Sequence, residues 1–277
     1  MSFLERLAAR TERVGSCLCL GLDPHPDQLP RGFSRDVSGI EDFARLVLEA
    51  GTRHAAAVKA NLAFFEAFGS PGMAALERLR ASIPGDVPFI ADAKRGDIGS
   101  TAERHASALF DTLGADAVTA SPYLGRDAIE PLIHHPRGFV YLLCRTSNAG
   151  AADVQGLPVD GEPLFVRVAR MAAQWDGGRG ALGLVVGATA PAELETARRT
   201  APGLAFLVPG VGAQGGAAQP VLEHGPAATA PAGGRRAGGL LVNVSRGIAG
   251  AAVEDRAADP FDAVARTAAD WAARLEC

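Results

Sequence analysis

The sequence predicts an α/β fold, a single (β/α)8 TIM barrel that spans residues 1–277. Three observations support this prediction. Short apolar runs recur along the chain, a segment with helical spacing follows each run, and charged residues interrupt the ends of several runs. A length of 277 residues suits one such barrel, although about 150 residues per domain would allow two domains. No linker divides the chain.

The apolar runs are nearly continuous in hydrophobicity, as expected for parallel strands that are covered on both faces. They occupy residues 16–23, 55–60, 87–94, 116–121, 138–147, 181–188, 204–210 and 239–245. Eight parallel strands that alternate with helices fit a closed barrel, and a doubly wound open sheet is the alternative fold.

The segments between the runs show the apolar spacing of amphipathic helices. One stripe with spacing i, i+3, i+4 and i+7 consists of Phe43, Leu46, Val47 and Ala50. A less regular stripe within residues 105–113 precedes Gly114, which suits a helix C-terminus. In the last helix, Asp259 is the expected N-cap and Pro260 the first helical residue. The buried stripe of that helix is expected to be Phe261, Val264, Ala265, Ala268, Ala272 and Leu275.

The composition is that of an ordinary globular protein, with 48% hydrophobic and 21% charged residues. The net charge of −4 implies no broad cationic face, so we expect neither nucleic acid nor an anionic membrane as a partner. Residues 1–16 are charged and amphipathic, unlike a signal peptide. No stretch has the roughly 18 to 20 apolar residues that span a bilayer, so we expect a soluble, cytoplasmic protein.

The cysteine and histidine patterns predict no metal site. The cysteines are few for this length and are expected to be reduced structural thiols, namely Cys17, Cys19, Cys144 and Cys277. The histidines are scattered. The chain has no H-E-x-x-H motif, no G-x-S-x-G motif and no spacing of four zinc ligands.

Residues 225–239 are rich in Ala, Pro and Gly and lack apolar periodicity. We expect a mobile surface loop here, between the seventh and eighth runs. Two interpretations stay open. The segment is a tolerated insertion, or it is a lid over a site, because loops at the C-terminal face of a barrel build its active site.

Charged residues at the C-terminal ends of the runs form the candidate site, since these ends face the active site of a barrel. Asp92 and Lys94 alternate on the third run and should point to the same side, with Lys59 on the neighbouring strand, about 5 Å away. Buried charges of opposite sign keep each other ionised, so a protonated lysine here could act as a general acid. A structural ion-pair network is the other interpretation.

The seventh run continues into a glycine-rich turn at residues 209–216. Its G-x-G-x-x-G spacing lies on the wrong unit for a dinucleotide fingerprint, which belongs to the first strand–helix unit. A phosphate site fits better, because loops after the seventh and eighth strands of these barrels often bind phosphate through backbone N–H groups. Arg246, at the end of the eighth run, would add a bidentate positive charge.

Together these segments resemble the orotidine 5′-phosphate decarboxylase family, in its bacterial branch with a D-A-K-R-G-D-I signature. The matching segments fall in order across nearly the whole chain, at residues 22–24, 58–61, 92–98 with Thr101, 209–214 and 243–247. The D-x-K-x-x-D core alone is shared with sugar-phosphate enzymes of the same superfamily. The longer signature combined with P-G-V-G-A-Q-G-G is much more specific.

The resemblance implies conversion of orotidine 5′-monophosphate to UMP and carbon dioxide, the last step of UMP biosynthesis, without metal or cofactor. Lys94 would protonate C6 of the pyrimidine, and Asp92 would lie near the substrate carboxylate. Lys59 and Asp97 would complete the charged network. The resemblance also implies a homodimer with shared active sites, in which Asp97 and Thr101 reach the partner's site.

The remaining substrate-binding residues also follow from the resemblance. Asp23 and Lys59 would hold the ribose hydroxyls, and Ser147 would bind the base. Gln214 and Arg246 would hold the phosphate, with Pro209 in the same segment as Gln214. Arg235 and Arg236 of the 225–239 segment are expected to be solvated, and a phosphate contact is the alternative for them.

Two other functions stay open. A sugar-phosphate decarboxylase or aldolase of the same superfamily would use Mg²⁺, and a non-catalytic barrel would bind UMP without turnover. The intact set of Asp92, Lys94 and Asp97 argues against a binding protein, because binding alone has no need of all three charges.

Overall fold

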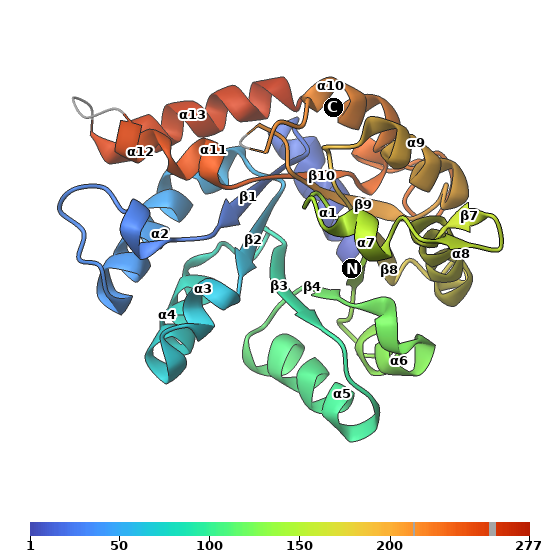
Figure 1. The fold of residues 1–277 in the computed structure, drawn as a ribbon. Coiled ribbons are helices and arrows are strands. Elements are labelled where there is room, and N and C mark those ends of the chain that lie inside the picture. Colours follow the sequence, from blue (N-terminus) through green and yellow to red (C-terminus); the bar gives the residue numbers. More distant parts are fainter. Residues whose placement is uncertain (213, 255–258) are drawn as a thin grey trace.

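The protein is described by a computed structural model that covers residues 1–212, 214–254 and 259–277 (Figure 1). Its main strands are β1 (Leu18–Leu22), β2 (Ala57–Asn61), β3 (Phe89–Arg95), β4 (Ala117–Ala120), β5 (Val140–Arg145), β8 (Leu182–Val186), β9 (Ala205–Pro209) and β10 (Leu241–Val244). They are parallel and close into a barrel in the order β1-β10-β9-β8-β5-β4-β3-β2. Each predicted run coincides with one of these strands, although β2 and β3 each extend one residue past the end of their run. The predicted barrel is confirmed, and the alternative prediction of a doubly wound open sheet is wrong.

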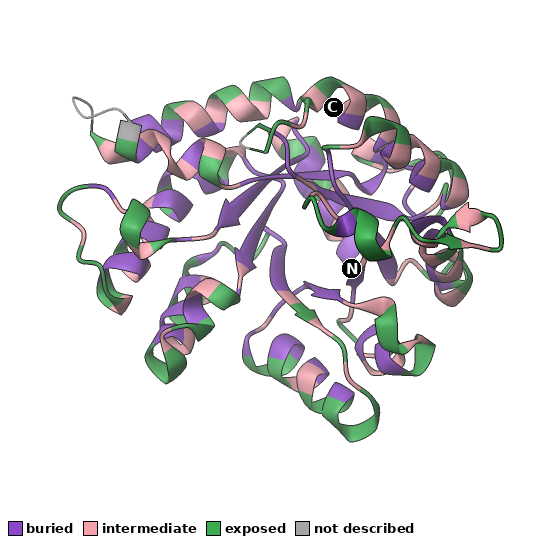
Figure 2. Ribbon diagram, in the orientation of Figure 1, coloured by how far each residue is buried: buried purple, intermediate pink, exposed green. Residues whose placement is uncertain are grey.

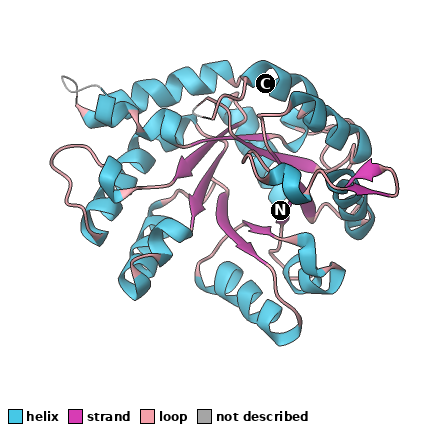
Figure 3. Ribbon diagram, viewed as in Figure 1, coloured by secondary structure: helices cyan, strands magenta, loops and turns pink. Residues whose placement is uncertain are grey.

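Helices surround the barrel between successive strands (Figure 3). The longer ones are α2 (Val37–Gly51), α4 (Gly69–Ser82), α5 (Gly99–Ala106), α6 (Arg126–Ile133), α8 (Leu164–Asp176), α9 (Pro191–Thr200), α10 (Ala218–His224) and α13 (Pro260–Arg274). Shorter ones are α3 (Ala63–Glu66), α7 (Ala151–Val154), α11 (Arg246–Ala249) and α12 (Ala251–Glu254). A small hairpin of β6 (Pro158–Val159) and β7 (Glu162–Pro163) lies between α7 and α8.

The strands are buried on both faces, which explains their continuous hydrophobicity (Figure 2). Side chains between the strands and the outer helices form one apolar cluster, and side chains inside the barrel form a second. Helix α1 (Phe3–Val14) closes the base of the second cluster. Its Phe3 ring stacks on Phe139 with centroids 4.4 Å apart and meets Tyr141 edge-on at 5.9 Å.

The predicted helices are present, with two local differences. The Asp259 side chain accepts a hydrogen bond from the Phe261 amide at 2.9 Å, which confirms the N-cap, but Phe261 itself is exposed. The stripe within residues 105–113 breaks because α5 continues into a π-helical segment, Ser107–Thr112. The longer turn shifts the inward side, so Ala108 is exposed and Phe110 is buried.

Residues 225–239 lie at the amino-terminal end of the barrel, against α1. Ala227 and Ala232 share the buried cluster of Phe3. The segment connects α10 to β10, and connections from a helix to the next strand of a barrel lie at this end. The lid interpretation is therefore wrong, because the barrel separates this segment from the strand ends that carry the charged residues.

The same location corrects the alternative role of two arginines. Arg236 lies 3.8 Å from a carboxylate oxygen of Glu12 in α1, and Arg235 donates to the Pro231 carbonyl at 3.1 Å. Neither side chain reaches the carboxyl ends of the strands. The mobility of the segment, and the assignment of residues 1–277 to one domain, stay predictions.

Among the described residues, none of the helices combines the length and the apolar composition that crossing a bilayer requires.

Candidate active site

A cavity of about 680 Å³ opens at the carboxyl ends of the barrel strands. Most of the site residues predicted from the sequence line it, namely Asp23, Lys59, Asp92, Lys94, Ser147, Pro209, Gln214 and Arg246. Asp97 and Thr101 are not among the residues that line the cavity in this chain. Asp97 is half-buried and Thr101 is exposed, both just beyond β3.

Asp92 joins the two lysines of the cavity. Its Oδ2 accepts a hydrogen bond from Lys59 Nζ at 2.8 Å, and its Oδ1 accepts one from Lys94 Nζ at 2.6 Å. The side chain of Lys59 is 5% exposed, whereas that of Lys94 is 47% exposed. Lys59 is therefore a fixed internal charge, and Lys94 is the ammonium group that a bound molecule can reach.

The cluster shifts the pKa values of its two buried members in opposite directions. Burial would raise the pKa of Asp92, but the charges of Lys59 and Lys94 outweigh burial and hold it well below its usual range. Burial would lower the pKa of Lys59, but the carboxylates of Asp92 and Asp23 outweigh burial and raise it. Both groups are consequently charged throughout the neutral pH range.

A β-bulge at the end of β3 sets the position of Lys94. Ala91 pairs with Val118 and Arg95 pairs with Ala120, so three residues of β3 face one residue of β4. Inside this bulge Lys94 has φ +48°, a left-handed conformation that is strained for a side chain other than glycine. Simple strand alternation, on which the sequence prediction relied, does not describe this segment, although the predicted contact with Asp92 is present.

The cavity wall contains polar residues to which the sequence analysis assigned no role, including His25, Asn61, Thr119, Gln155 and Asn243. Thr119 and Asn243 lie within apolar strand runs, where an isolated polar residue was the available signal. The Oδ1 atoms of Asp23 and Asn243 are buried and have no hydrogen-bond partner among the described residues. Such atoms require a partner, and a ligand hydroxyl or amide in the cavity would supply one.

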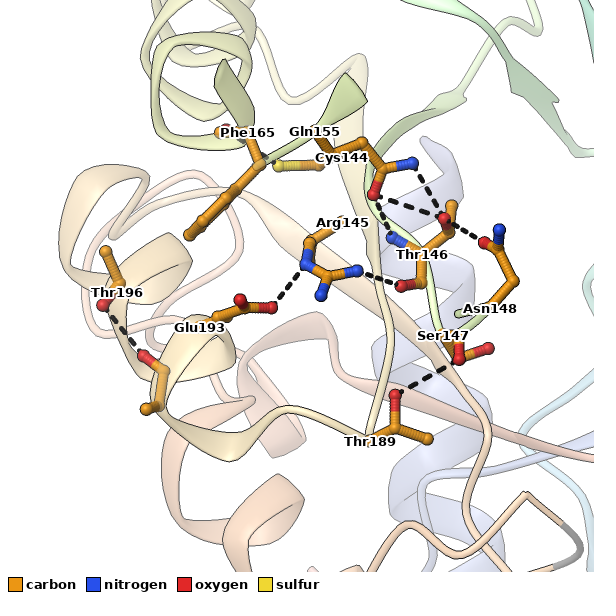
Figure 4. A network of polar contacts seen from close by, with 11 residues as sticks. Cys144, Arg145, Thr146, Ser147, Asn148, Gln155, Phe165, Thr189, Glu193 and Thr196 are labelled. Atoms are coloured by element: carbon orange, nitrogen blue, oxygen red, sulfur yellow. Dashed lines mark hydrogen bonds and ion pairs between the residues drawn. The ribbon is translucent and has the colours of Figure 1, made fainter. Parts of the chain in front are cut away.

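The end of β5 holds Ser147 through a network of polar contacts (Figure 4). The Gln155 side chain accepts the Thr146 N–H at 2.8 Å and donates to Thr146 Oγ1 at 2.8 Å. Arg145 donates to the Thr146 carbonyl at 2.6 Å and pairs with Glu193 of α9. The residue before Ser147 is thus held on both its amide and its carbonyl sides.

Ser147 and Gln214 connect two loops across the cavity. Ser147 Oγ donates to Gln214 Oε1 at 2.6 Å, which leaves the Gln214 amide nitrogen to donate to a ligand. Gly210 permits this close approach: its φ is +99°, and a Cβ there would lie 3.0 Å from Gln214 Oε1 and 3.2 Å from Ser147 Cβ.

The glycine-rich turn uses several of its own N–H groups, which corrects one expectation. Gly212 donates to Gly216 at 3.0 Å, Gly215 to Gly212 at 2.7 Å, and Gly216 to Gly210 at 3.0 Å, each to a carbonyl oxygen. These groups are not available to a phosphate, because the turn uses them to hold its own shape around Gln214. Residue 213 lies outside the described residues.

Arg246 supplies the accessible positive charge near this turn. It is exposed, it begins α11 and it lines the cavity. Within the part of the chain that the structure describes, it forms no ion pair with a carboxylate. Its guanidinium group is therefore available to an anion of the ligand.

Lysine occurs at two positions of the whole chain, Lys59 and Lys94, and all other residues of the Lys and Arg total are arginines. Both lysines line the cavity. Arginine keeps its proton in proteins, whereas a lysine ammonium can give one up. Both lysine ammonium groups of the chain are consequently in this site.

Comparison with known proteins agrees with the geometry. The model of the orotidine 5′-phosphate decarboxylase / HUMPS family matches residues 16–260. The chain belongs to this family. The matched residues include all strands of the barrel and every site residue predicted from the sequence.

Individual family members resemble the chain over most of its length. An orotidine 5′-phosphate decarboxylase of Roseiflexus castenholzii is 48% identical over 270 residues, which are 97% of this chain and 95% of that protein. The structure of Leishmania donovani OMP decarboxylase has a TM-score of 0.82 at 39% identity and covers 100% of both chains. The structure of Leishmania donovani UMP synthase has a TM-score of 0.83 at 40% identity, and the match covers 100% of this chain and 57% of that one.

Proposed function

We propose that this chain decarboxylates orotidine 5′-monophosphate to UMP and carbon dioxide, the last step of UMP biosynthesis, without metal or cofactor. The observation that carries the proposal is the carboxylate of Asp92 held between Lys59 and Lys94 at the cavity. Membership of the decarboxylase family supports it. The cavity volume of about 680 Å³ lies in the range of small-molecule sites.

The charged cluster supports a specific sequence of bond changes. The bond between C6 of the pyrimidine and the carboxylate carbon breaks, carbon dioxide leaves, and the electron pair stays on C6. The Lys94 ammonium stabilises this developing charge and donates a proton to C6, and the resulting amine later takes a proton from water. Asp92 lies beside the departing carboxylate, and Lys59 keeps Asp92 ionised.

The rest of the cavity fits the rest of the nucleotide. Asp23 and Lys59 bind the ribose hydroxyls, a role supported by the unpartnered Oδ1 of Asp23. Ser147 binds the base from the end of β5. Gln214 and Arg246 bind the phosphate, and Pro209 forms part of the adjoining wall. Phosphate binding remote from C6 contributes energy that closes and orients the site.

The same proposal includes a homodimer with shared active sites, in which Asp97 and Thr101 act in the partner's site. Neither residue lines the cavity of its own chain, and both follow β3, which carries Asp92 and Lys94. Apolar side chains are exposed at Ile98, Tyr123 and Leu124, in the segments that follow β3 and β4. Such side chains are typical of a surface that another protein covers. A cytoplasmic location also stays a prediction.

Subunit mixing tests the shared site. Lys94→Ala and Asp97→Ala proteins should each be inactive. After the two are unfolded and refolded together, about a quarter of the sites should be intact, because each mixed dimer combines both defects in one site and none in the other. Absence of activity in the mixture, with dimers present, would show that Asp97 acts within its own chain.

The decarboxylation itself is tested by following the absorbance of orotidine 5′-monophosphate with purified protein in EDTA. We expect complete conversion to UMP at an undiminished rate. Activity that EDTA abolishes and Mg²⁺ restores would favour the metal-dependent sugar-phosphate reaction. Tight UMP binding without any turnover would identify a non-catalytic nucleotide-binding barrel.

A further inference from the structure

The bulge in β3 leaves one residue of β4, Thr119, opposite three residues of β3. The regular pairing ends at Ala91 with Val118 and resumes at Arg95 with Ala120. Beyond the bulge, the Ser121 amide donates to the Arg95 carbonyl at 2.8 Å, as in an ordinary ladder. Within it, the Lys94 amide donates to the side-chain Oγ1 of Thr119 at 3.0 Å. The Thr119 hydroxyl is thus the acceptor for a strand amide whose acceptor elsewhere in the sheet is a backbone carbonyl.

The same hydroxyl group makes a second hydrogen bond. Thr119 Oγ1 donates to Asp92 Oδ1 at 2.8 Å, the oxygen that also accepts from Lys94 Nζ. Thr119 is 1% exposed and lines the cavity from inside the barrel wall. A hydroxyl has one hydrogen to donate, and here that hydrogen is directed at Asp92 while a lone pair accepts from Lys94.

We propose that Thr119 is a positioning residue for the decarboxylation, which holds Lys94 in its left-handed conformation and orients the carboxylate of Asp92. The effect of Thr119 on kcat rests on the proposed function. Its effect on the backbone conformation of Lys94 does not depend on that function.

Removal of the hydroxyl should act on the reaction more than on binding. The Lys94 amide would lose its acceptor, and the strained φ of +48° would lose the contact that opposes its relaxation. Asp92 would keep both lysine contacts, so the charge of the site would be unchanged. A small rotation of the Lys94 backbone displaces Nζ from C6, and misplacement of about 1 Å can lower a rate about 100-fold.

Matched variants separate the hydroxyl from the shape of the side chain. Thr119→Val removes the hydroxyl and keeps the branched shape, whereas Thr119→Ser keeps the hydroxyl. We expect kcat of the valine variant to fall about 10- to 100-fold, with the affinity for UMP within about 3-fold of wild type. Affinity for a UMP analogue with an anionic oxygen at C6 should fall in parallel with kcat. The serine variant should recover kcat to within about 3-fold.

The two-lysine composition provides a test that does not depend on activity. Protein labelled with ¹⁵N-lysine gives two backbone amide signals, from Lys59 and Lys94. In Thr119→Val, hydrogen exchange of the Lys94 amide should accelerate at least about 10-fold, with Lys59 as the internal control. Thr119→Ser should retain the protection. If the valine variant fails to fold, Thr119→Ala is measured in the same way, with the same expectation.

The outcomes distinguish the two proposals. A wild-type protein that does not decarboxylate the nucleotide refutes the proposed function, and faster Lys94 exchange in Thr119→Val would then still support the positioning of Lys94. Unchanged kcat or unchanged Lys94 exchange in the variant without the hydroxyl overturns the inference. Equal losses of kcat and UMP affinity that serine does not rescue also overturn it, since they would indicate a purely structural residue.

Discussion

Neutralising Asp92 should destabilise the fold, because the buried ammonium of Lys59 depends on it. In Asp92→Asn the contact of 2.8 Å between Lys59 Nζ and a carboxylate is lost, and the Lys59 side chain is 5% exposed. Breaking a buried ion pair from one side costs about 3 to 5 kcal/mol. With an unfolding entropy of about 2.1 cal/mol/K per residue, this cost lowers Tm by about 5 to 9 °C for a chain of 277 residues.

Urea unfolding at pH 7 measures this difference, and Asp27→Asn is the matched control. Asp27 forms an exposed ion pair with Arg35 at 3.5 Å, so its neutralisation should change stability little. A second change, Lys59→Met, should restore most of the stability lost in Asp92→Asn, because it removes the unpaired charge. Destabilisation of Asp92→Asn by less than about 1 kcal/mol would refute the claim that the two groups depend on each other.

The pH dependence of this difference has a definite sign. The pKa of Asp92 is lowered in the folded protein, so its stabilisation is present above the unfolded pKa of about 3.9 and is lost as the pH falls further. The pKa of Lys59 is raised, so its contribution is present below the unfolded pKa of about 10.4 and is lost at higher pH. The stability gap between wild type and Asp92→Asn should therefore be constant from about pH 5 to pH 8.

Three further results follow from the geometry of the site and of the chain terminus. Arg246→Ala should raise KM for the nucleotide about 10- to 100-fold and leave turnover of the nucleoside without phosphate unchanged. Equal effects of this substitution on both substrates would exclude a phosphate contact. The ¹⁵Nζ signal of Lys59 should not titrate below pH 10.5, since its pKa is raised, and a midpoint under that value would contradict the described charge balance. A hydrogen bond with Cys17 lowers the pKa of the Cys277 thiol to about 7. Iodoacetamide should therefore modify Cys277 before the other cysteines, at a rate that rises from pH 6 to pH 8. Labelling of Cys277→Ser to the same extent as wild type would disprove this.

The barrel could be predicted because each strand carries its own signal. Apolar runs of strand length, separated by helical segments, are local features, and a barrel strand lies at every run. Lys59 and Asp92 could be paired in advance for a similar reason, since consecutive strands of a barrel are neighbours. In the observed register Asn61 pairs with Asp92 and Lys59 pairs with Ile90, so Lys59 lies on the strand beside Asp92, two residues before its direct partner.

The parts that could not be predicted depend on pairing between strands or on the direction of the chain. The bulge in β3 exists only relative to β4, so the conformation of Lys94 and the role of Thr119 leave no mark on either segment alone. The π-helical segment Ser107–Thr112 has a different cause, because its wider turn shifts a helical stripe that was predicted from regular α-helical spacing. For residues 225–239 only the lid alternative is wrong, and their place after a helix already assigns them to the base of a barrel.

The central claim is that Lys94 performs the decarboxylation as the proton donor at C6. The measurement that tests it most directly is UMP formation from orotidine 5′-monophosphate in EDTA, by wild type and by Lys94→Ala. Wild type should form one UMP for each carbon dioxide released. The variant should be slower by at least about 10⁴-fold while it binds UMP within about 3-fold of wild type. UMP formation by Lys94→Ala within about 10-fold of the wild-type rate would contradict the account.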